Sequence, residues 1–469
     1  MLAHWGHTVV LVDREGGRRP LAESLPPSCI PLLEAIGVRQ AVDAAGFLRA
    51  TGNTVWWGGA PRRVEPFPGG ALGYQVLSTR LDAVLRDRAV AAGTTLLRPA
   101  TARRVEGEGP PFLVTVAAAD GDLALRAAWV LDCTGRTGVF SRARRSVTGS
   151  DLRTMAVVGE WERAGGWGLP DESHTLVESV PWGWGWSVPV SATRRFVTVM
   201  LDPAATALAA GPDLALRYHA LLHALPALGG LVQNAHLDGA PWACDATPYA
   251  SESVVSERVL AVGDAASFID PLSSFGVKKA LASGWMAAVA VHTALATPAN
   301  ADAALTLFAE RERDYVTAAT RELGHLSQQA DAREGSGFWQ SRASLDADEV
   351  EAASIERLRR DADVLAAFQE LRQRASARLV RSPQLRITSR PMIRGNVVIS
   401  DDHLALPGLP EATRYVRSVD LLIALDVATR TDDVGEMFAQ YSRRLGPVAL
   451  PDFLGALAVL VAKGGATFA

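Results

Sequence analysis

The sequence has almost no lysine. Its only lysines are Lys278, Lys279 and Lys463, and arginine supplies the rest of the positive charge. Lysine is therefore excluded as a catalytic group from the first 277 positions. Lys278 and Lys279 lie just inside a predicted helix, where solvent is their expected neighbour.

The chain also lacks long apolar runs, paired cysteines and a marked excess of charge of one sign. No run reaches the roughly 18 to 20 apolar residues of a membrane span, so no membrane partner is expected. A net charge of −4 gives no electrostatic reason to expect nucleic acid. Cys29, Cys133 and Cys244 lie far apart and form no CxxC motif, which favours a reducing cytoplasm. The 469 residues, 48% of them hydrophobic, suffice for two or three domains and a large core.

The stretch from Val259 to Gly284 has the clearest functional pattern. Its first four residues are apolar and predict a short buried strand, which Gly263 and Asp264 end. A proline-bearing loop then leads to a helix that starts near Val277. The helix start presents unpaired N–H groups and about half a positive charge, and the Asp264 carboxylate can accept hydrogen bonds from a sugar hydroxyl. This order predicts a site for an anionic or phosphate-bearing group, although an ordinary βα unit with a glycine loop has the same elements.

The start of the chain resembles the second strand of a dinucleotide-binding domain. The β-branched run Thr8–Val12 predicts a parallel strand that ends at Asp13. In such domains an acidic residue here bonds the ribose about 20 residues after a glycine fingerprint, which does not occur upstream of Thr8. Two explanations stay open. Either about 25 further residues precede Met1, which we favour, or the protein has lost pyrophosphate binding.

Three shorter patterns lie between these two regions. The segment Glu23–Pro27 precedes a predicted helix over Ser28–Gly37, and Leu77–Ala92 predicts a second amphipathic helix. Trp129–Arg136 predicts a strand that ends in the turn Asp-Cys-Thr-Gly. All three are typical of an α/β domain.

Alternating patterns between Leu152 and Asp245 predict a mainly antiparallel sheet over a substrate. Within it, Pro181–Pro189 reads PWGWGWSVP, whose alternating glycines and tryptophans expose flat aromatic surfaces suited to an aromatic or peptide substrate. Gly46–Gly59 predicts a strand that enters this sheet, with Trp56 and Trp57 on opposite faces.

In this order the segments resemble FAD-dependent monooxygenases and flavin-dependent tryptophan halogenases. The loop after Gly263 is similar to their second flavin-binding motif, Glu23–Pro27 to GEx(x)P with Ala22 for glycine, and Trp184–Pro189 to WxWxIP. Arg80 resembles an arginine that contacts FAD phosphates, and the turn after Trp129 resembles the DATG turn. The resemblance implies FAD as cofactor, bound by Asp13, Arg14, Glu23, Ser24, Arg80, Gly263, Asp264, Pro271, Ser274, Gly276 and Val277. It implies that the substrate is bound by Trp56, Trp184, Trp186 and Pro189.

The resemblance also implies a fold. We expect an α/β protein with a Rossmann-like FAD-binding domain (1–45, 75–150 and 250–300) that lacks its first strand and glycine loop. An inserted, mainly antiparallel substrate domain (46–74 and 151–249), a helical region (301–380) and a small α+β domain (381–469) complete it. In the last segment, two or three strands followed by three helices resemble the winged-helix peptide-binding domain of ribosomal-peptide maturation enzymes. A subdomain that covers the flavin domain is the alternative.

Three functions stay open. The first is a monooxygenase that hydroxylates an electron-rich aromatic substrate, indole-like or tryptophan-like and possibly peptide-borne, through a flavin C4a-hydroperoxide, with electrons from a flavin reductase or NAD(P)H. The second is halogenation, but halogenases carry an essential lysine near Gly46–Gly59, where this chain has Phe47, Leu48, Arg49 and Ala50, and arginine differs in shape and protonation. The third is a degenerate flavoprotein that acts as a binding partner.

No residue is tied to catalysis by spacing, and no metal site is expected. His219 and His223 lie four apart on a predicted helix but have no further ligands at suitable spacing.

Overall fold

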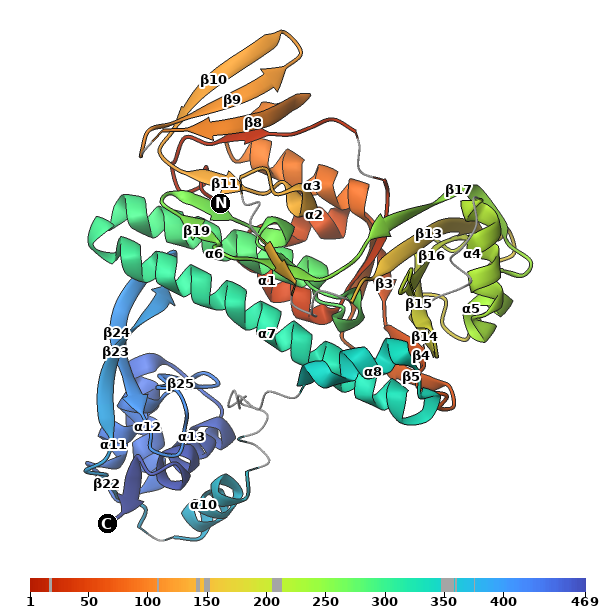
Figure 1. Cartoon of the computed structure of the whole chain (residues 1–469). Helices are drawn as coiled ribbons and strands as arrows, with labels where there is room; N and C mark the ends of the chain where they lie inside the picture. Colours follow the sequence, from red (N-terminus) through yellow and green to blue (C-terminus); the bar gives the residue numbers. More distant parts are fainter. Residues whose placement is uncertain are drawn as a thin grey trace. The chain divides into compact units, whose positions relative to one another are not determined.

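A computed structural model describes residues 1–16, 19–107, 109–140, 144–146, 152–204, 213–346, 358, 361–374 and 376–469. The chain forms two compact units, Met1–Asp348 and Glu349–Ala469. Each contains helices and open sheets (Figure 1). The protein is therefore a mixed α/β protein, as predicted, while the finer four-part division stays a prediction.

Two small sheets of the first unit each contain one pair of parallel strands. β1 (Val10–Val12) pairs with β7 (Thr95–Leu97), and β11 (Val130–Asp132) pairs with β20 (Val259–Ala261). β19 (Val255–Ser256) runs antiparallel on the outer side of β20. Among the described residues, no strand joins the two sheets.

Helices and a small antiparallel sheet pack beside these strands. Leu25, Leu33, Val76 and Leu81 form one core with the start of α6, where Val277 and Leu281 lie. The elements concerned are β2 (Ala22–Leu25), β6 (Gly73–Leu77), β3 (Leu48–Ala50), α1 (Ile30–Ala35), α2 (Arg39–Ala44), α3 (Ser78–Ala91) and α6 (Gly276–Ala296).

The strand expected over Gly46–Gly59 is in fact two strands in different sheets. β3 pairs with β6, whereas β4 (Gly52–Trp56) belongs to the large substrate sheet. The first residue of β4, Gly52, must be glycine because a Cβ there would lie 2.3 Å from the Glu65 carbonyl oxygen of the neighbouring strand. A single-strand prediction could not detect this change of sheet, since β-branched and aromatic residues continue through it.

The large sheet has seven strands in the order β17-β13-β16-β15-β14-β4-β5 and is antiparallel except for the pair β14–β4. Helices α4 and α5 cover one face, and residues of α7 and α8 pack against the other (Figure 1). The strands are β5 (Arg63–Pro66), β13 (Met155–Glu162), β14 (Thr175–Val180), β15 (Gly183–Pro189), β16 (Arg194–Leu201) and β17 (His236–Asp245). The helices are α4 (Leu214–His223), α5 (Pro226–Val232), α7 (Ala301–Glu334) and α8 (Gly337–Ala343).

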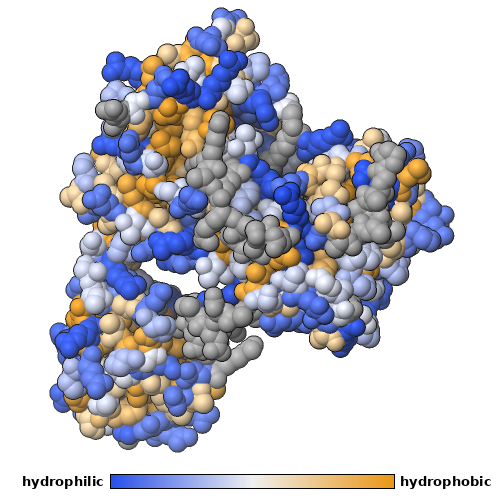
Figure 2. Space-filling view, viewed as in Figure 1, coloured by the Kyte–Doolittle hydropathy of each residue, from blue (hydrophilic) through white to orange (hydrophobic). Residues whose placement is uncertain are grey.

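Two smaller groups of strands complete the first unit. A three-stranded meander, which the sequence patterns did not reveal, keeps Leu113 and Leu123 40% and 41% exposed, and hydrophobic side chains gather along it in Figure 2. Its strands are β8 (Ala100–Glu106), β9 (Phe112–Ala118) and β10 (Gly121–Ala127). A second sheet contains β12 (Arg144–Ser146), β18 (Tyr249–Ser251) and β21 (Ser267–Phe268).

The second unit has three helices after a long hairpin, in the predicted order of strands followed by helices. The hairpin strands are β23 (Arg386–Arg394) and β24 (Val397–Ala405). The other elements are α10 (Ala362–Gln373), β22 (Leu379–Arg381), β25 (Tyr415–Val416), β26 (Val419–Asp420), α11 (Leu421–Ala428), α12 (Val434–Leu445), α13 (Leu450–Ala462) and β27 (Ala466–Phe468). The helical prediction for residues 347–357 lies outside the described residues.

No single helix in the described ranges is long and apolar enough to cross a bilayer. Of the helices that the structure describes, only α12 and α13 reach that length and composition together, and they are bent by 104°.

Candidate flavin site

Two turns meet at the carboxyl ends of β11 and β20. These strands are parallel, with Val130 opposite Val259. The segments that follow them therefore leave the sheet at the same edge. The short helical turns that follow, Gly135–Thr137 and Gly263–Ala265, contact each other. In open α/β sheets this edge is where ligands bind.

Asp132 organises the first turn. Its side chain is fully buried, and Oδ1 accepts hydrogen bonds from the Thr134 N–H at 3.1 Å and the Thr134 hydroxyl at 2.6 Å. Oδ2 accepts one from the Phe140 N–H at 2.9 Å. The carboxylate of the Asp-Cys-Thr-Gly turn therefore shapes the backbone and does not face a ligand.

The second turn depends on a glycine and presents a carboxylate. Gly263 has φ +62°, a left-handed conformation that favours glycine, and its N–H donates to the Ser283 hydroxyl at 2.8 Å. Asp264 is half-buried beside it, and its carbonyl accepts a hydrogen bond from the Tyr249 hydroxyl. The Asp264 carboxylate thus lies on a backbone that is fixed on both sides.

A buried lysine side chain forms hydrogen bonds with the backbone of the same turn. Lys279 is 1% exposed, and its Nζ donates to the carbonyls of Gly263 at 2.5 Å and Ser267 at 2.6 Å. The Glu312 carboxylate of α7 lies 3.8 Å from this Nζ. Burial lowers the pKa of Lys279 and raises the pKa of Glu312. The expectation of solvent around Lys279 is therefore wrong, because the side chain turns inward along α6.

The loop after the turn leads directly into an open helix start. Asp270 accepts a hydrogen bond from the Leu272 N–H at 2.9 Å and begins the short turn Pro271–Ser273, and burial raises the pKa of Asp270. Ser274 is left-handed with φ +54°, and α6 begins two residues later without a side-chain cap. Ser274 and Gly276 are exposed, so the first N–H groups of α6 are open to a ligand.

The predicted Glu23–Pro27 segment lies close to this helix. β2, which carries Glu23 and Ser24, contacts α6, and so does α1 immediately after it. Residues far apart in sequence thus surround the start of α6. Direct contact of Glu23 and Ser24 with the cofactor stays a prediction.

Three other predicted cofactor residues have different surroundings. The Asp13 carboxylate pairs with Arg98 at 3.0 Å and Arg86 at 3.5 Å, and the neighbouring Arg14 is exposed. Arg80 donates to the Ala45 carbonyl at 2.6 Å and lies over the Phe47 ring. Asp13 and Arg80 are therefore engaged by their own neighbours, and their contact with a cofactor stays a prediction.

An aromatic face of the large sheet packs against the loop that precedes α6. The rings of Trp184 and Trp186 stack with centroids 4.8 Å apart, and both belong to a hydrophobic cluster with Phe268 and Leu272 of the loop. Pro189 ends the same strand. The Trp-rich strand and the loop that precedes α6 therefore border one site.

Trp56 and Trp57 face opposite sides, as predicted, but only one faces the loop. Trp57 packs in the cluster of Trp184 and donates its indole N–H to the Leu326 carbonyl at 3.0 Å, whereas Trp56 packs beneath α4 and α5. The geometry favours Trp57 over Trp56 at the site. The sequence did not show that Trp57, rather than Trp56, packs beside this loop. It also did not show that Trp339 belongs to the same cluster. The only sequence feature that marks Trp339 is the aromatic pair Phe338–Trp339 after a long helix.

His219 and His223 both lie in α4, at the face of the sheet away from the loop. In the described ranges, no group of three or more His, Cys, Asp or Glu side chains is placed to hold a metal ion.

A family model named tryptophan halogenase matches residues 63–395, more than half of the chain. The chain belongs to the tryptophan halogenase family. A tryptophan 2-halogenase from Chondromyces crocatus is 29% identical over 312 residues, covering 63% of this chain and 58% of that protein. The chain thus spans less than two thirds of the length of this relative.

Solved structures give the same fold at lower identity. CmlS, a flavin-dependent halogenase, aligns with a TM-score of 0.73 and 19% identity over 94% of this chain and 90% of that chain. The peptidyl tryptophan dihydroxylase QhpG, essential for tryptophylquinone cofactor biogenesis, aligns with a TM-score of 0.67 and 20% identity over 99% and 95%. These likenesses show the fold of the family.

The cofactor of this tryptophan halogenase family member is FAD. The residues at the second turn fit one part of it, since a left-handed glycine, a half-buried carboxylate and an uncapped helix start suit a polyhydroxyl chain and a polar ring edge. Asp264 would hold the ribityl hydroxyls, and the first N–H groups of α6 would face the ring.

We predict that Asp264→Ala weakens FAD binding about 10-fold to 100-fold, because it removes charge-assisted hydrogen bonds worth roughly 1.5–3 kcal/mol. Titration of FAD, followed by quenching of its fluorescence, measures the change. Glu252→Ala, which removes an exposed carboxylate before β20, is the matched control and should bind as the original protein does. Equal affinity in both variants would contradict the role of Asp264.

Proposed function

We propose that this protein is an FAD-dependent monooxygenase that hydroxylates an electron-rich aromatic substrate. The substrate would be indole-like or tryptophan-like, either a small molecule or a side chain within a peptide. The observation that carries the proposal is the aromatic face of Trp184 and Trp186 against Phe268 and Leu272 of the flavin loop. Stacked aromatic side chains favour flat, electron-rich partners.

The positions and hydrogen bonds of the lysines favour hydroxylation over halogenation. The chain has no lysine before position 278, and the Lys279 ammonium is held by two carbonyls beneath the turn. In the segment where halogenases carry their lysine, Arg49 pairs with Asp43 at 2.9 Å and lies 4.1 Å from the Tyr74 ring centroid, and Ala50 is fully buried. This segment therefore offers no free amine to position a hypohalous acid.

The residues of the chain contribute binding, orientation and exclusion of water. Reduced FAD supplies the activation of molecular oxygen when it is bound. Trp57, Trp184 and Trp339 are each less than 5% exposed and keep water from this side of the loop. In this proposal Asp264 holds the cofactor, and Trp186 stacks on the substrate. The half-buried state of Trp186 supports its role, because part of its ring remains accessible.

Halogenation is the second candidate, because the family model and the relative from Chondromyces crocatus are both tryptophan halogenases. Hydroxylation has support from the fold of QhpG, which acts on peptidyl tryptophan. The electron donor would be a flavin reductase or NAD(P)H.

Product analysis separates the two reactions. The protein is supplied with reduced FAD, oxygen and either free tryptophan, indole or a tryptophan-containing peptide, with and without bromide, in the presence of catalase. We expect products that gain one oxygen atom and do not depend on bromide. Products in which bromine replaces hydrogen would overturn the proposal in favour of halogenation, and no turnover of any of these substrates would count against both.

A variant pair tests the aromatic face. Trp186→Phe is expected to lower kcat/KM about threefold to tenfold, since an aromatic pair is worth roughly 0.5–1.5 kcal/mol. Trp182→Phe alters the opposite face of the sheet, where Trp182 packs with the α4–α5 core, and should leave kcat/KM unchanged. Equal kcat/KM values for the two variants would place the substrate elsewhere.

A further inference from the structure

Strand β10 is a long edge strand that is open to solvent. The meander has the order β10-β9-β8, and β8 contacts β1. β10 lies on the outer side of the meander, and within the described residues it pairs only with β9 (Figure 1). All of its residues are exposed except Leu125 and Ala127, which are half-buried. An edge strand of this kind is a template for pairing with another strand.

Three residues of β10 direct their backbone groups toward the open edge. Ala118 and Gly121 lie opposite each other across a two-residue turn, in which the carbonyl of the first accepts a hydrogen bond from the N–H of the second. From there, hydrogen-bonded and non-hydrogen-bonded pairs alternate along the antiparallel ladder, whose register has no bulge. The N–H and C=O groups that point away from β9 are therefore those of Asp122, Ala124 and Arg126. All three residues are exposed, so another strand can reach these groups.

The sequence of β10 is complementary to itself when the strand is reversed. In an antiparallel pair of two β10 strands with Ala124 at the centre, Asp122 of each copy lies opposite Arg126 of the other. Leu123 of each copy lies opposite Leu125 of the other, on the other face of the sheet. The outward backbone groups fit this register, since Ala124 meets Ala124 and each Asp122 meets Arg126 in hydrogen-bonded pairs. Charges, apolar side chains and backbone groups therefore favour the same arrangement.

The side chains of these pairs are available at the surface. Within the described residues, neither Asp122 nor Arg126 forms an ion pair or a side-chain hydrogen bond. Leu123 is 41% exposed, whereas Leu125 is half-buried against the core that contains Val114. Both leucines lie on the same face of the meander as this core. Leu123 of a second copy would therefore cover Leu125 and extend the core across the pair.

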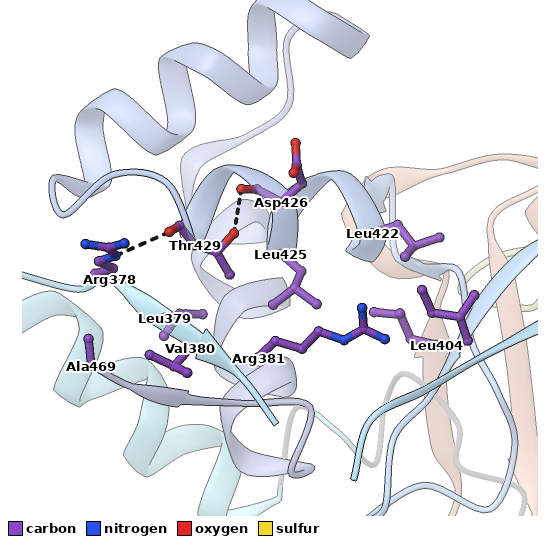
Figure 3. Close-up of a pocket in the computed structure, with 11 residues that line it drawn as sticks. Arg378, Leu379, Val380, Arg381, Leu404, Leu422, Leu425, Asp426, Thr429 and Ala469 are labelled. Carbon is purple, nitrogen blue, oxygen red and sulfur yellow. Dashed lines mark hydrogen bonds between the residues drawn. The ribbon is translucent and has the colours of Figure 1, made fainter. Parts of the chain in front are cut away.

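Two other edge strands lack this combination. β5, at the edge of the large sheet, contains Pro66, which has no N–H to donate, and its Arg63 already pairs with Glu65 of the same strand at 3.1 Å. In the second unit, β22 borders a cavity of about 590 Å³ (Figure 3). It has three residues, and Leu379 is 1% exposed, which leaves little accessible backbone. Of these three strands, β10 combines length, exposure and self-complementary charge.

We infer that two copies of the chain associate through β10, which joins their meanders into one continuous antiparallel sheet about a two-fold axis. The partner is a second copy because the charges and leucines of β10 complement the same strand in reverse, as a two-fold interface requires. One strand from each copy makes a small interface, so we expect a dissociation constant of roughly 10–100 µM. The inference does not depend on the proposed reaction, because association requires neither FAD nor turnover.

Sedimentation velocity of the full chain at about 1–300 µM measures this association, because dimer formation depends on concentration. Asp122→Arg makes both charged positions of β10 positive, and Arg126→Asp makes both negative, so each variant places like charges opposite each other. We expect each variant alone to have a dissociation constant at least about tenfold higher than the original protein. An equimolar mixture of the two variants restores opposite charges in both pairs and should associate with about the original affinity.

Arg103→Asp is the matched control. It makes the same charge change as Arg126→Asp at an exposed residue of β8, on the opposite edge of the meander, and should leave the dissociation constant unchanged. Thermal unfolding establishes that each variant is folded. A chain that stays monomeric over the whole concentration range would overturn the inference. A dimer that Asp122→Arg and Arg126→Asp leave unchanged would also overturn it, as would a mixture that associates no better than either variant alone.

Discussion

Replacing Lys279 by methionine is expected to lower the free energy of unfolding of the first unit by about 3–5 kcal/mol. The change removes two hydrogen bonds and leaves the carbonyls of Gly263 and Ser267 without their donor in a buried position. It also leaves the Glu312 carboxylate buried without the ammonium that lies 3.8 Å away. Urea unfolding followed by tryptophan fluorescence measures the effect on the first unit specifically, because all twelve tryptophans lie between residues 5 and 339.

The neighbouring residue provides a control of the same size and charge. Lys278 is only half-buried and extends over the Phe275 ring, so Lys278→Met should change the unfolding free energy by less than about 1 kcal/mol. Adding Glu312→Leu to Lys279→Met should restore part of the loss, because removing both charges from a buried pair costs far less than removing one. A loss below that of Lys278→Met would show that Lys279 does not hold the turn.

Arg195→Met is also expected to lower the free energy of unfolding of the first unit by about 3–5 kcal/mol. Arg195 lies in the substrate sheet. Arg195 is fully buried, and burial lowers its pKa to about 9. Its guanidinium donates to the Ser187 hydroxyl at 2.9 Å, the Glu172 carbonyl at 3.0 Å and the His174 carbonyl at 2.7 Å. These bonds fasten the strand that carries Trp184 and Trp186 to the loop before β14, so kcat/KM should fall together with stability.

Arg194 is the matched control for this second prediction. It lies next in sequence but is 42% exposed, and it pairs with Asp238 at 2.9 Å and with Glu160 at the surface. Such pairs contribute roughly 0–1 kcal/mol, so Arg194→Met should unfold within about 1 kcal/mol of the original protein. If Arg195→Met and Arg194→Met unfold at the same urea concentration, the hydrogen bonds of the buried guanidinium do not stabilise the fold.

Both predictions concern residues whose burial the sequence did not reveal: Lys279 was expected to face solvent, and Arg195 was not singled out. A lysine in an apolar helix and an arginine at the start of the strand run Arg194–Leu201 resemble solvated charges when only spacing is considered. Their burial depends on carbonyl groups contributed by distant segments. Periodicity along one helix or strand contains no information about those groups.

The local elements were predicted more successfully. The strand, glycine turn, proline loop and helix of Val259–Gly284 are present as β20, the turn Gly263–Ala265, the loop and α6. The three helices of the last segment are also confirmed. Each depends on short-range chemistry, such as apolar runs, glycine conformations and helix periodicity.

The sequence by itself determined the family, the glycine turn with Asp264 and the aromatic strand, because each lies within one contiguous segment. Only the tertiary structure decided that Trp57 and not Trp56 faces the loop, that Gly52 begins a strand in another sheet, and that Lys279 lies beneath the turn. The physical reason is that burial and hydrogen bonding of a side chain depend on what packs against it from elsewhere in the chain.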